Sequence, residues 1–480
     1  MPSFSGRFQY LNADGAPVQA GPCKLTFEAE SLTVVPASGA PLAFDLGDID
    51  VFAPADYELS LTLYTGKKIV LNQFGKASQN LRHDLLEAYR QRLIQCLLLE
   101  DLEEITRFDG FARLESPART FSSPAEFRLY KSNLAALPTE ATGFQWRLAD
   151  IDAVTFDEAN YAVTLQAADE RLTVTKLAKR TREFSERLQE AVAQLTEKAA
   201  EALHNLFPFL NPDQFQQAAQ LMKEGRAALL ARLQAIHPKA AQALEENVVD
   251  RQLRPYFEAL RQYTPAGWPY TGFKLLRKDE DREGAPESPG DSPEVSAAEE
   301  TAREAMPEGM QVSALRQAQG GERSRTAPGA EPAPEGAAEE SAELPILHWF
   351  FFPLAATPSA KCPANLIAWE STSRGGRATY FFRLVPPEQA RQLQDPARGP
   401  ALIDAGVRQL NRALVLLNFR REPIYLPDDA LEIQPRYRRY AIACRKIPEL
   451  GRLRASFLGR AIHTSLPAWQ KQFENFLAKA

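Results

Sequence analysis

The chain contains one stretch of its own sequence twice, and this duplication limits its fold more than any other feature. Residues 46–76 and 148–179 each run from a Leu through Asp-Ile-Asp to a Tyr, which opens an alternating apolar run. In both, a polar turn leads to a second alternating run that a Lys closes. The match extends upstream to Phe44 and Trp146, and its offset stays between 102 and 104 residues. A chance motif would not keep this spacing, so the sequence predicts a duplicated domain.

In the first copy, seven short extended segments precede one amphipathic helix. The segments alternate apolar and polar residues or are rich in β-branched and aromatic ones, and turn residues separate them. From residue 77 to 99 the apolar residues change to helical spacing. The second copy repeats this plan and ends in a helix over 181–195, which 199–206 extend. The strands predicted in the first copy span 4–11, 24–28, 32–36, 42–46, 49–52, 57–64 and 67–74.

Seven strands followed by one helix resemble the pleckstrin-homology-like fold, in which two orthogonal sheets form an open barrel and the helix plugs one end. The resemblance implies tandem barrels over 1–103 and 104–205, with protein partners or phosphoinositides as ligands. Many pleckstrin-homology domains hold a lipid headgroup with basic residues of the first hairpin loop. Here 12–22 contain no basic residue and 115–124 contain only Arg119. An anionic headgroup would find little complementary charge, so we expect protein partners.

The next two segments differ sharply in composition. Residues 206–266 are predicted to form a helical hairpin, with helices over 211–236 and 240–263. The first starts at Asn211-Pro212-Asp213, where an Asx cap precedes Pro in the first turn. Residues 279–343 are rich in Glu, Ala, Pro, Gly and Ser and lack aromatic residues, which predicts a disordered acidic insertion.

Around this insertion we predict a basic α+β domain formed by 267–278 together with 344–480. The first segment supplies an edge strand of its antiparallel sheet, and the last two strands flank a hairpin signal at 373–376. The fold class is therefore α+β and multidomain: two seven-stranded open barrels, each plugged by its C-terminal helix, a helical hairpin, and this C-terminal domain. Its other predicted strands span 346–354, 365–371 and 379–385, and its predicted helices 387–394, 400–419, 447–462 and 468–479.

The charge of the chain is unevenly distributed. The net charge is −6, with a pI near 5.7, which argues against affinity of the whole molecule for nucleic acid. From residue 345 onward, however, about twenty Lys and Arg stand against about ten Asp and Glu. Arg interleaved with Tyr suits phosphate contact and stacking, so nucleic acid or an anionic membrane surface is a candidate ligand. Alternatively, these cations cap helices or pair with the acidic N-terminal domains. The candidate polyanion-binding residues are Arg436, Tyr437, Arg438, Arg439, Tyr440, Arg445, Lys446, Arg452, Arg454 and Arg460.

No sequence motif indicates an enzyme or a cofactor. Asp48 and Asp50, like Asp150 and Asp152, match the Asp-x-Asp pattern with which some glycosyltransferases hold a divalent metal, because two carboxylates can share a hard cation. The simpler interpretation is that the Ile packs inward while both Asp face water. No histidine pair has metal-ligand spacing, and phosphate-loop, dinucleotide and nucleophile-elbow motifs are missing from the sequence.

Three functional hypotheses remain. The four scattered cysteines form no CxxC pair, no signal peptide is visible, and no apolar run reaches the length of a membrane span, which together favour a cytoplasmic protein. The first hypothesis is a non-enzymatic interaction or adaptor protein that binds partner peptides at a barrel edge or beside a helix. The second is a peripheral binder of anionic membranes or nucleic acid that uses residues 436–460. The third is a metal-dependent transferase that uses one Asp pair.

Overall fold

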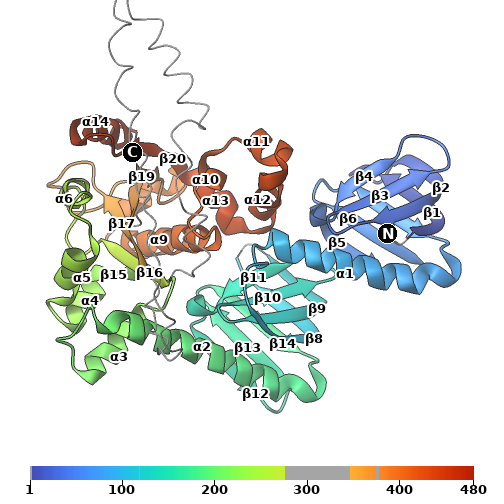
Figure 1. Cartoon of the computed structure of the whole chain (residues 1–480), viewed down its shortest axis with the longest axis horizontal. Coiled ribbons are helices and arrows are strands. Elements are labelled where there is room, and N and C mark those ends of the chain that lie inside the picture. Colours follow the sequence, from blue (N-terminus) through green and yellow to red (C-terminus); the bar gives the residue numbers. More distant parts are fainter. Residues whose placement is uncertain (1–2, 118, 276–345, 373–377, 480) are drawn as a thin grey trace, which may run out of the picture. The chain divides into compact units, whose positions relative to one another are not determined.

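The structure is a computed structural model of the chain, and it describes residues 3–117, 119–275, 346–372 and 378–479 (Figure 1). The predicted disordered insertion over 279–343 and the predicted hairpin turn over 373–376 lie outside these residues. Contacts divide the chain into two units, Met1–Lys274 with Leu347–Ala480, and Leu275–Ile346. The sites below belong to the first unit.

The first copy forms a seven-stranded antiparallel sheet followed by helix α1 (Ser78–Cys96). Its strand order is β4-β3-β2-β1-β7-β6-β5, so β4 and β5 are the terminal strands. As the alternation predicts, Leu59 faces Leu71 and Leu61 faces Ile69, and all four side chains are buried. The strands are β1 (Ser3–Leu11), β2 (Pro17–Phe27), β3 (Ser31–Pro36), β4 (Leu42–Asp45), β5 (Ile49–Pro54), β6 (Glu58–Leu63) and β7 (Lys68–Asn72).

The second copy repeats this topology, with the strand order β11-β10-β9-β8-β14-β13-β12. Helix α2 (Thr181–His204) buries Phe184 against the sheet core, where its ring lies 5.1 Å from Phe108 and 5.9 Å from Phe127. Two seven-stranded antiparallel sheets are therefore confirmed, and they fit a barrel-like fold. The strands are β8 (Glu104–Glu115), β9 (Thr120–Tyr130), β10 (Asn133–Pro138), β11 (Phe144–Arg147), β12 (Ala153–Asp157), β13 (Ala162–Ala167) and β14 (Glu170–Thr175).

The two long helices predicted after the second copy are each broken, so the expected helical hairpin is wrong. The predicted start at Asn211 is confirmed, because its side chain and that of Gln214 form a reciprocal capping box. The first helix is interrupted over 222–229, where Gly225 has a φ of +78° and donates its N–H to the carbonyl of Phe273. The second is interrupted between Val248 and Arg254. The chain instead forms α3 (Pro212–Leu221), β15 (Ala228–Leu229), α4 (Leu230–Ile236), α5 (Ala240–Val248) and α6 (Arg254–Gln262).

The C-terminal sheet has six strands in the order β15-β16-β17-β18-β19-β20. Two expectations need correction. Strand β16 is not at the edge, because the two-residue strand β15 pairs with it. The predicted helix over 447–462 ends at Ser456, and the remaining residues form β20, which pairs with β19. The strands are β16 (Tyr270–Leu275), β17 (Ile346–Leu354), β18 (Leu366–Ser371), β19 (Ala378–Phe382) and β20 (Phe457–Ile462).

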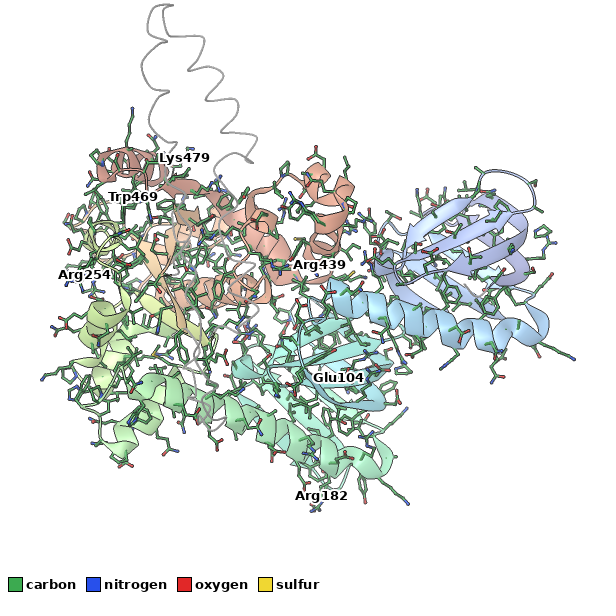
Figure 2. All side chains as sticks on the ribbon, viewed as in Figure 1. Glu104, Arg182, Arg254, Arg439, Trp469 and Lys479 are labelled. Carbon is green, nitrogen blue, oxygen red and sulfur yellow. The ribbon has the colours of Figure 1, made fainter. Side chains whose placement is uncertain are left out.

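Helices bury both faces of this sheet. On one face, Trp469 of α14 (labelled in Figure 2) packs in a cluster with Phe257, Phe350 and Phe381. On the other, Trp349 donates its indole N–H to Asn411 of α9 at 3.0 Å. The helical elements after β19 are η5 (Pro387–Gln394), α9 (Gly399–Leu416), α10 (Glu422–Tyr425), α11 (Asp428–Ile433), α12 (Pro435–Lys446), α13 (Pro448–Ser456) and α14 (Leu466–Leu477).

Candidate interaction sites

Helix α12 carries most of the basic residues that the sequence singled out, and three of them bind the first Asp-Ile-Asp motif. Asp48 ends the 3-10 turn η1 (Leu46–Asp48), which joins β4 to β5. Its Oδ2 accepts a hydrogen bond from Arg438 Nη2 at 2.7 Å, and its Oδ1 accepts one from Arg445 Nη2 at 2.6 Å. All three side chains are partly buried, with exposed fractions between 14% and 24%. The pairs are therefore screened less than pairs on the open surface.

Lys446, at the end of α12, is buried against the same motif. Its ammonium donates to Asp50 Oδ1 at 3.0 Å and to the carbonyl of Ile49 at 2.8 Å. A buried ammonium without such partners would be strongly unfavourable. Arg439, labelled in Figure 2, pairs with Glu100 beyond the end of α1. Four basic residues of α12 thus bind carboxylates of the first copy.

The contact continues as an alternating chain of charges. Glu432 of α11 pairs with both Arg438 and Arg445. Arg438 also lies 3.7 Å from Asp45, which in turn accepts hydrogen bonds of 3.0 and 2.8 Å from Arg92 of α1. Burial alone would lower the pKa of Arg92, but its hydrogen bonds with Asp45 and the nearby negative charges raise it above the usual value. Arg92 therefore stays charged and paired with Asp45.

The second Asp-Ile-Asp motif binds cations in the same way, although from different elements. Asp150 ends η3 (Leu148–Asp150) and pairs with Arg412 of α9 at 3.2 Å. It also lies 3.9 Å from Arg147, whose guanidinium donates to the carbonyls of Gly225 at 2.8 Å and Glu224 at 3.2 Å. Burial lowers the pKa of Arg147.

A divalent metal at either motif would have to displace these cations. Asp152 has the most exposed side chain of the four aspartates. Even so, its carboxylate accepts a hydrogen bond from the Ala168 N–H at 2.9 Å and lies 3.9 Å from Arg226. Within the described ranges, no three His, Cys, Asp or Glu side chains come together as metal ligands. The geometry therefore favours a structural role for both motifs.

The other candidate polyanion-binding residues lie around this contact. Arg454 binds the C-terminal end of α10, donating to Leu426 O at 2.7 Å, and pairs with Asp428 at 2.6 Å. Arg460 stacks over a tyrosine ring of α10 at 4.5 Å. Arg452 is exposed and lies 3.8 Å from a glutamate of its own helix.

Within α12, the aromatic residues contact the arginines next to them. The Arg436 guanidinium lies 4.5 Å from the centre of the Tyr437 ring. The Tyr440 hydroxyl accepts a hydrogen bond from Arg439 at 3.1 Å. The structure therefore brings the ten predicted residues into one region, where carboxylates, carbonyls and tyrosine rings contact most of the cations.

A second site lies at β5, a terminal strand of the first copy's sheet. There β5 and α1 contact a segment of the second copy. Phe52 of β5 donates its N–H to the carbonyl of Thr139 at 2.8 Å. Further along the same loop, Gly143 packs so tightly on Leu93 of α1 that a Cβ would lie 2.6 Å from it. Gln145 then donates to the carbonyl of Leu97 at 2.5 Å. Residues 139–145 therefore contact both β5 and α1, and we call this place the β5–α1 edge.

The corresponding place in the second copy, which we call the β12–α2 edge, is more exposed. Val154 is the counterpart of Phe52, because each pairs with an equivalent leucine, Leu165 and Leu61. Phe52 is only 1% exposed, whereas Val154, Phe156 and Val192 are partly exposed. Among the described residues β12 has a strand neighbour only on its β13 side.

The chain matches no known protein family, and a search of curated proteins finds no relative. None of the helices in the described part of the chain is both long enough and apolar enough to cross a membrane.

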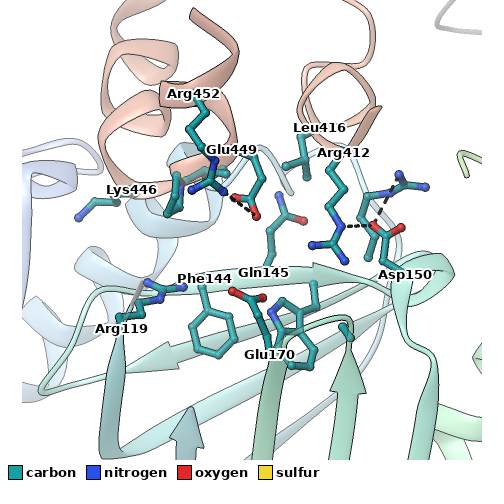
Figure 3. A pocket seen from close by; sticks show the side chains of 15 residues that line it. Arg119, Phe144, Gln145, Asp150, Glu170, Arg412, Leu416, Lys446, Glu449 and Arg452 are labelled. Carbon is teal, nitrogen blue, oxygen red and sulfur yellow. Dashed lines mark ion pairs between the residues drawn. The ribbon is translucent and has the colours of Figure 1, made fainter. Parts of the chain in front are cut away.

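A third site, a small pocket, was missed by the sequence analysis (Figure 3). It lies between the second copy and helices α9 and α13, and its charged walls include Arg119, Glu170, Arg412 and Glu449. These residues are far apart in the chain and share no motif. The sequence analysis had named Arg119, Asp150, Lys446 and Arg452, which all line the pocket, but for other ligands and without connecting them.

Proposed function

We propose that this chain is a non-enzymatic interaction protein with two pleckstrin-homology-like domains, in which the β12–α2 edge of the second domain binds an extended segment of a protein partner. The observation that carries the proposal is the β5–α1 edge. There a strand N–H and a helix surface of this fold already bind a chain segment, residues 139–145.

The same physics applies to the second copy. A terminal strand presents N–H and C=O groups to an added strand, and side-chain pockets beside it select the sequence. The partly exposed Val154, Phe156 and Val192 supply apolar surface next to β12. A bound segment would cover them as Gly143 packs on the Leu93 side chain in the first copy.

The test is to screen a displayed library of random peptides against the full-length chain and then to measure the affinity of the selected peptides. We expect Val154→Asp and Val192→Asp each to weaken binding at least tenfold. The matched control is Val35→Asp on β3, which is 41% exposed and belongs to the sheet of the first copy, not to that of β12. Equal binding by wild type and both edge variants, with unchanged circular dichroism, would contradict the proposal.

Binding of a polyanion through α12 is the weaker proposal. Arg438, Arg445 and Lys446 already bind carboxylates, so a polyanion would have to displace Asp48 and Asp50. A salt series of liposome co-sedimentation and nucleic-acid gel shifts tests it. Binding that weakens steeply with salt, and strengthens in Asp48→Asn, would favour the polyanion.

A further inference from the structure

The pocket between the second copy and the C-terminal helices is lined by charged side chains of both signs. Phe144 of β11 and Leu416 of α9 line it with apolar side chains (Figure 3). Trp146 of β11 also lines the pocket. Its volume is about 50 Å³, enough for about four water-sized groups. The site therefore suits a compound of only a few heavy atoms.

Some of the charged groups are already paired. Arg412 pairs with Asp150 at 3.2 Å, and Arg452 lies 3.8 Å from Glu449. Lys446 also borders the pocket, but its ammonium binds Asp50. These contacts fix the positions of the surrounding charges.

Two groups of opposite sign remain without such a pair. The Arg119 guanidinium lies over the Phe144 ring, 4.9 Å from its centre, and among the described residues it has no ion pair or side-chain hydrogen bond. Within the same residues, the Glu170 carboxyl also has neither. Burial lowers the pKa of Arg119, and burial followed by repulsion from Glu449 raises the pKa of Glu170. Attraction between Arg119 and Glu170 offsets part of this desolvation, but neither group has a direct ion pair or side-chain hydrogen bond among the described residues.

We propose that this pocket binds a small zwitterion of the α-amino acid class. Its carboxylate pairs with Arg119, and its ammonium pairs with Glu170. Its side chain lies against Phe144 and Trp146, and the small volume admits glycine or alanine. The proposal does not depend on partner binding at the β12–α2 edge, which uses other residues.

Charge balance distinguishes a zwitterion from a simple ion. An anion such as phosphate would satisfy Arg119 but would be repelled by Glu170 and Glu449. A cation would satisfy the two glutamates but would be repelled by Arg119, Arg412 and Arg452. A zwitterion compensates both unpaired groups at once, and charge-assisted hydrogen bonds to each would hold it.

The experiment is calorimetric titration of the full-length chain at low salt with glycine and L-alanine. Acetate, methylammonium and inorganic phosphate serve as probes of one sign. We expect saturable binding of one amino acid per chain, and at least tenfold weaker binding of each single-sign probe. Absence of saturable amino acid binding to folded wild-type protein, or tighter binding of phosphate, would overturn the proposal.

Variants then test the assigned contacts. We expect Arg119→Gln and Glu170→Gln each to weaken amino acid binding at least tenfold. The control is Arg113→Gln, which removes an exposed arginine of the same domain that pairs with Glu115 outside the pocket. Circular dichroism and the melting temperature establish that each variant is folded. An unchanged affinity in folded Arg119→Gln would overturn the assignment.

Discussion

Replacing Asp48 with Asn should loosen α12 from the first copy. The carboxylate accepts two charge-assisted hydrogen bonds, from Arg438 at 2.7 Å and Arg445 at 2.6 Å. Such bonds contribute about 1.5–3 kcal/mol each when well formed. The loss is smaller here because the Asn oxygen still accepts one bond and both arginines keep Glu432. We therefore expect the free energy that holds α12 on the first copy to fall by about 2 kcal/mol, a value between those of exposed and buried ion pairs.

Hydrogen exchange measured by mass spectrometry is the appropriate assay, because it reports the opening of α12 itself. If α12 exchanges through separation from the first copy, about 2 kcal/mol corresponds to roughly 30-fold faster exchange. The increase should shrink at high salt, because salt weakens the wild-type pairs as well. Asp56→Asn is the matched control, since this exposed carboxylate of the same copy has no ion pair among the described residues. Unchanged exchange of α12 in Asp48→Asn would refute the reasoning.

Three further perturbations test the packing. Leu61→Ala should destabilise the first copy by about 2–5 kcal/mol, because Leu61 is fully buried, and a denaturation midpoint equal to wild type would exclude this core position. Gly225→Ala should destabilise the chain more than Gly15→Ala. Both glycines have a positive φ, but only at Gly225 would an added Cβ clash with the Arg147 side chain. Equal melting temperatures of the two variants would contradict this. Burial lowers the pKa of His348 to about 4 from 6.5, so the unfolded chain takes up a proton in this interval that the folded chain does not. Stability should fall as the pH falls through it, and less so in His348→Leu; equal urea midpoint losses between pH 7 and 5 would contradict the assignment.

The duplicated sheets could be predicted from sequence because their signals are local. Alternation in 57–64 places Leu59 and Leu61 on one face, and the structure pairs them across the turn with Leu71 and Ile69. Repetition of the same pattern in the second copy made each assignment support the other. The helical hairpin failed for the opposite reason. Gly225 is an ordinary loop or helix residue in sequence, and its role depends on the carbonyl of Phe273, which is distant in the chain.

The candidate sites depend on contacts of this distant kind. Arg438 and Arg445 are seven residues apart and so lie on one face of a helix, a signal that assignment of α12 would have revealed. Their partner Asp48 is 390 residues away from Arg438, and no sequence pattern connects them. Likewise, Arg119 and Glu170 meet α13 only because the C-terminal helices pack on the second copy.

The two copies differ where they meet other parts of the chain. Both keep an Asp-Ile-Asp turn that binds arginines, yet α12 supplies them in one case and α9 in the other. The terminal strands β5 and β12 also differ in the backbone groups that they can offer. Strand β5 ends in Pro54, which has no N–H, and the N–H of its Phe52 already donates to the Thr139 carbonyl. Strand β12 has no proline and leaves Val154 partly exposed. The bond from Phe52 to Thr139 links the two copies at the β5–α1 edge, whereas the β12–α2 edge is the one that our proposal assigns to a partner segment.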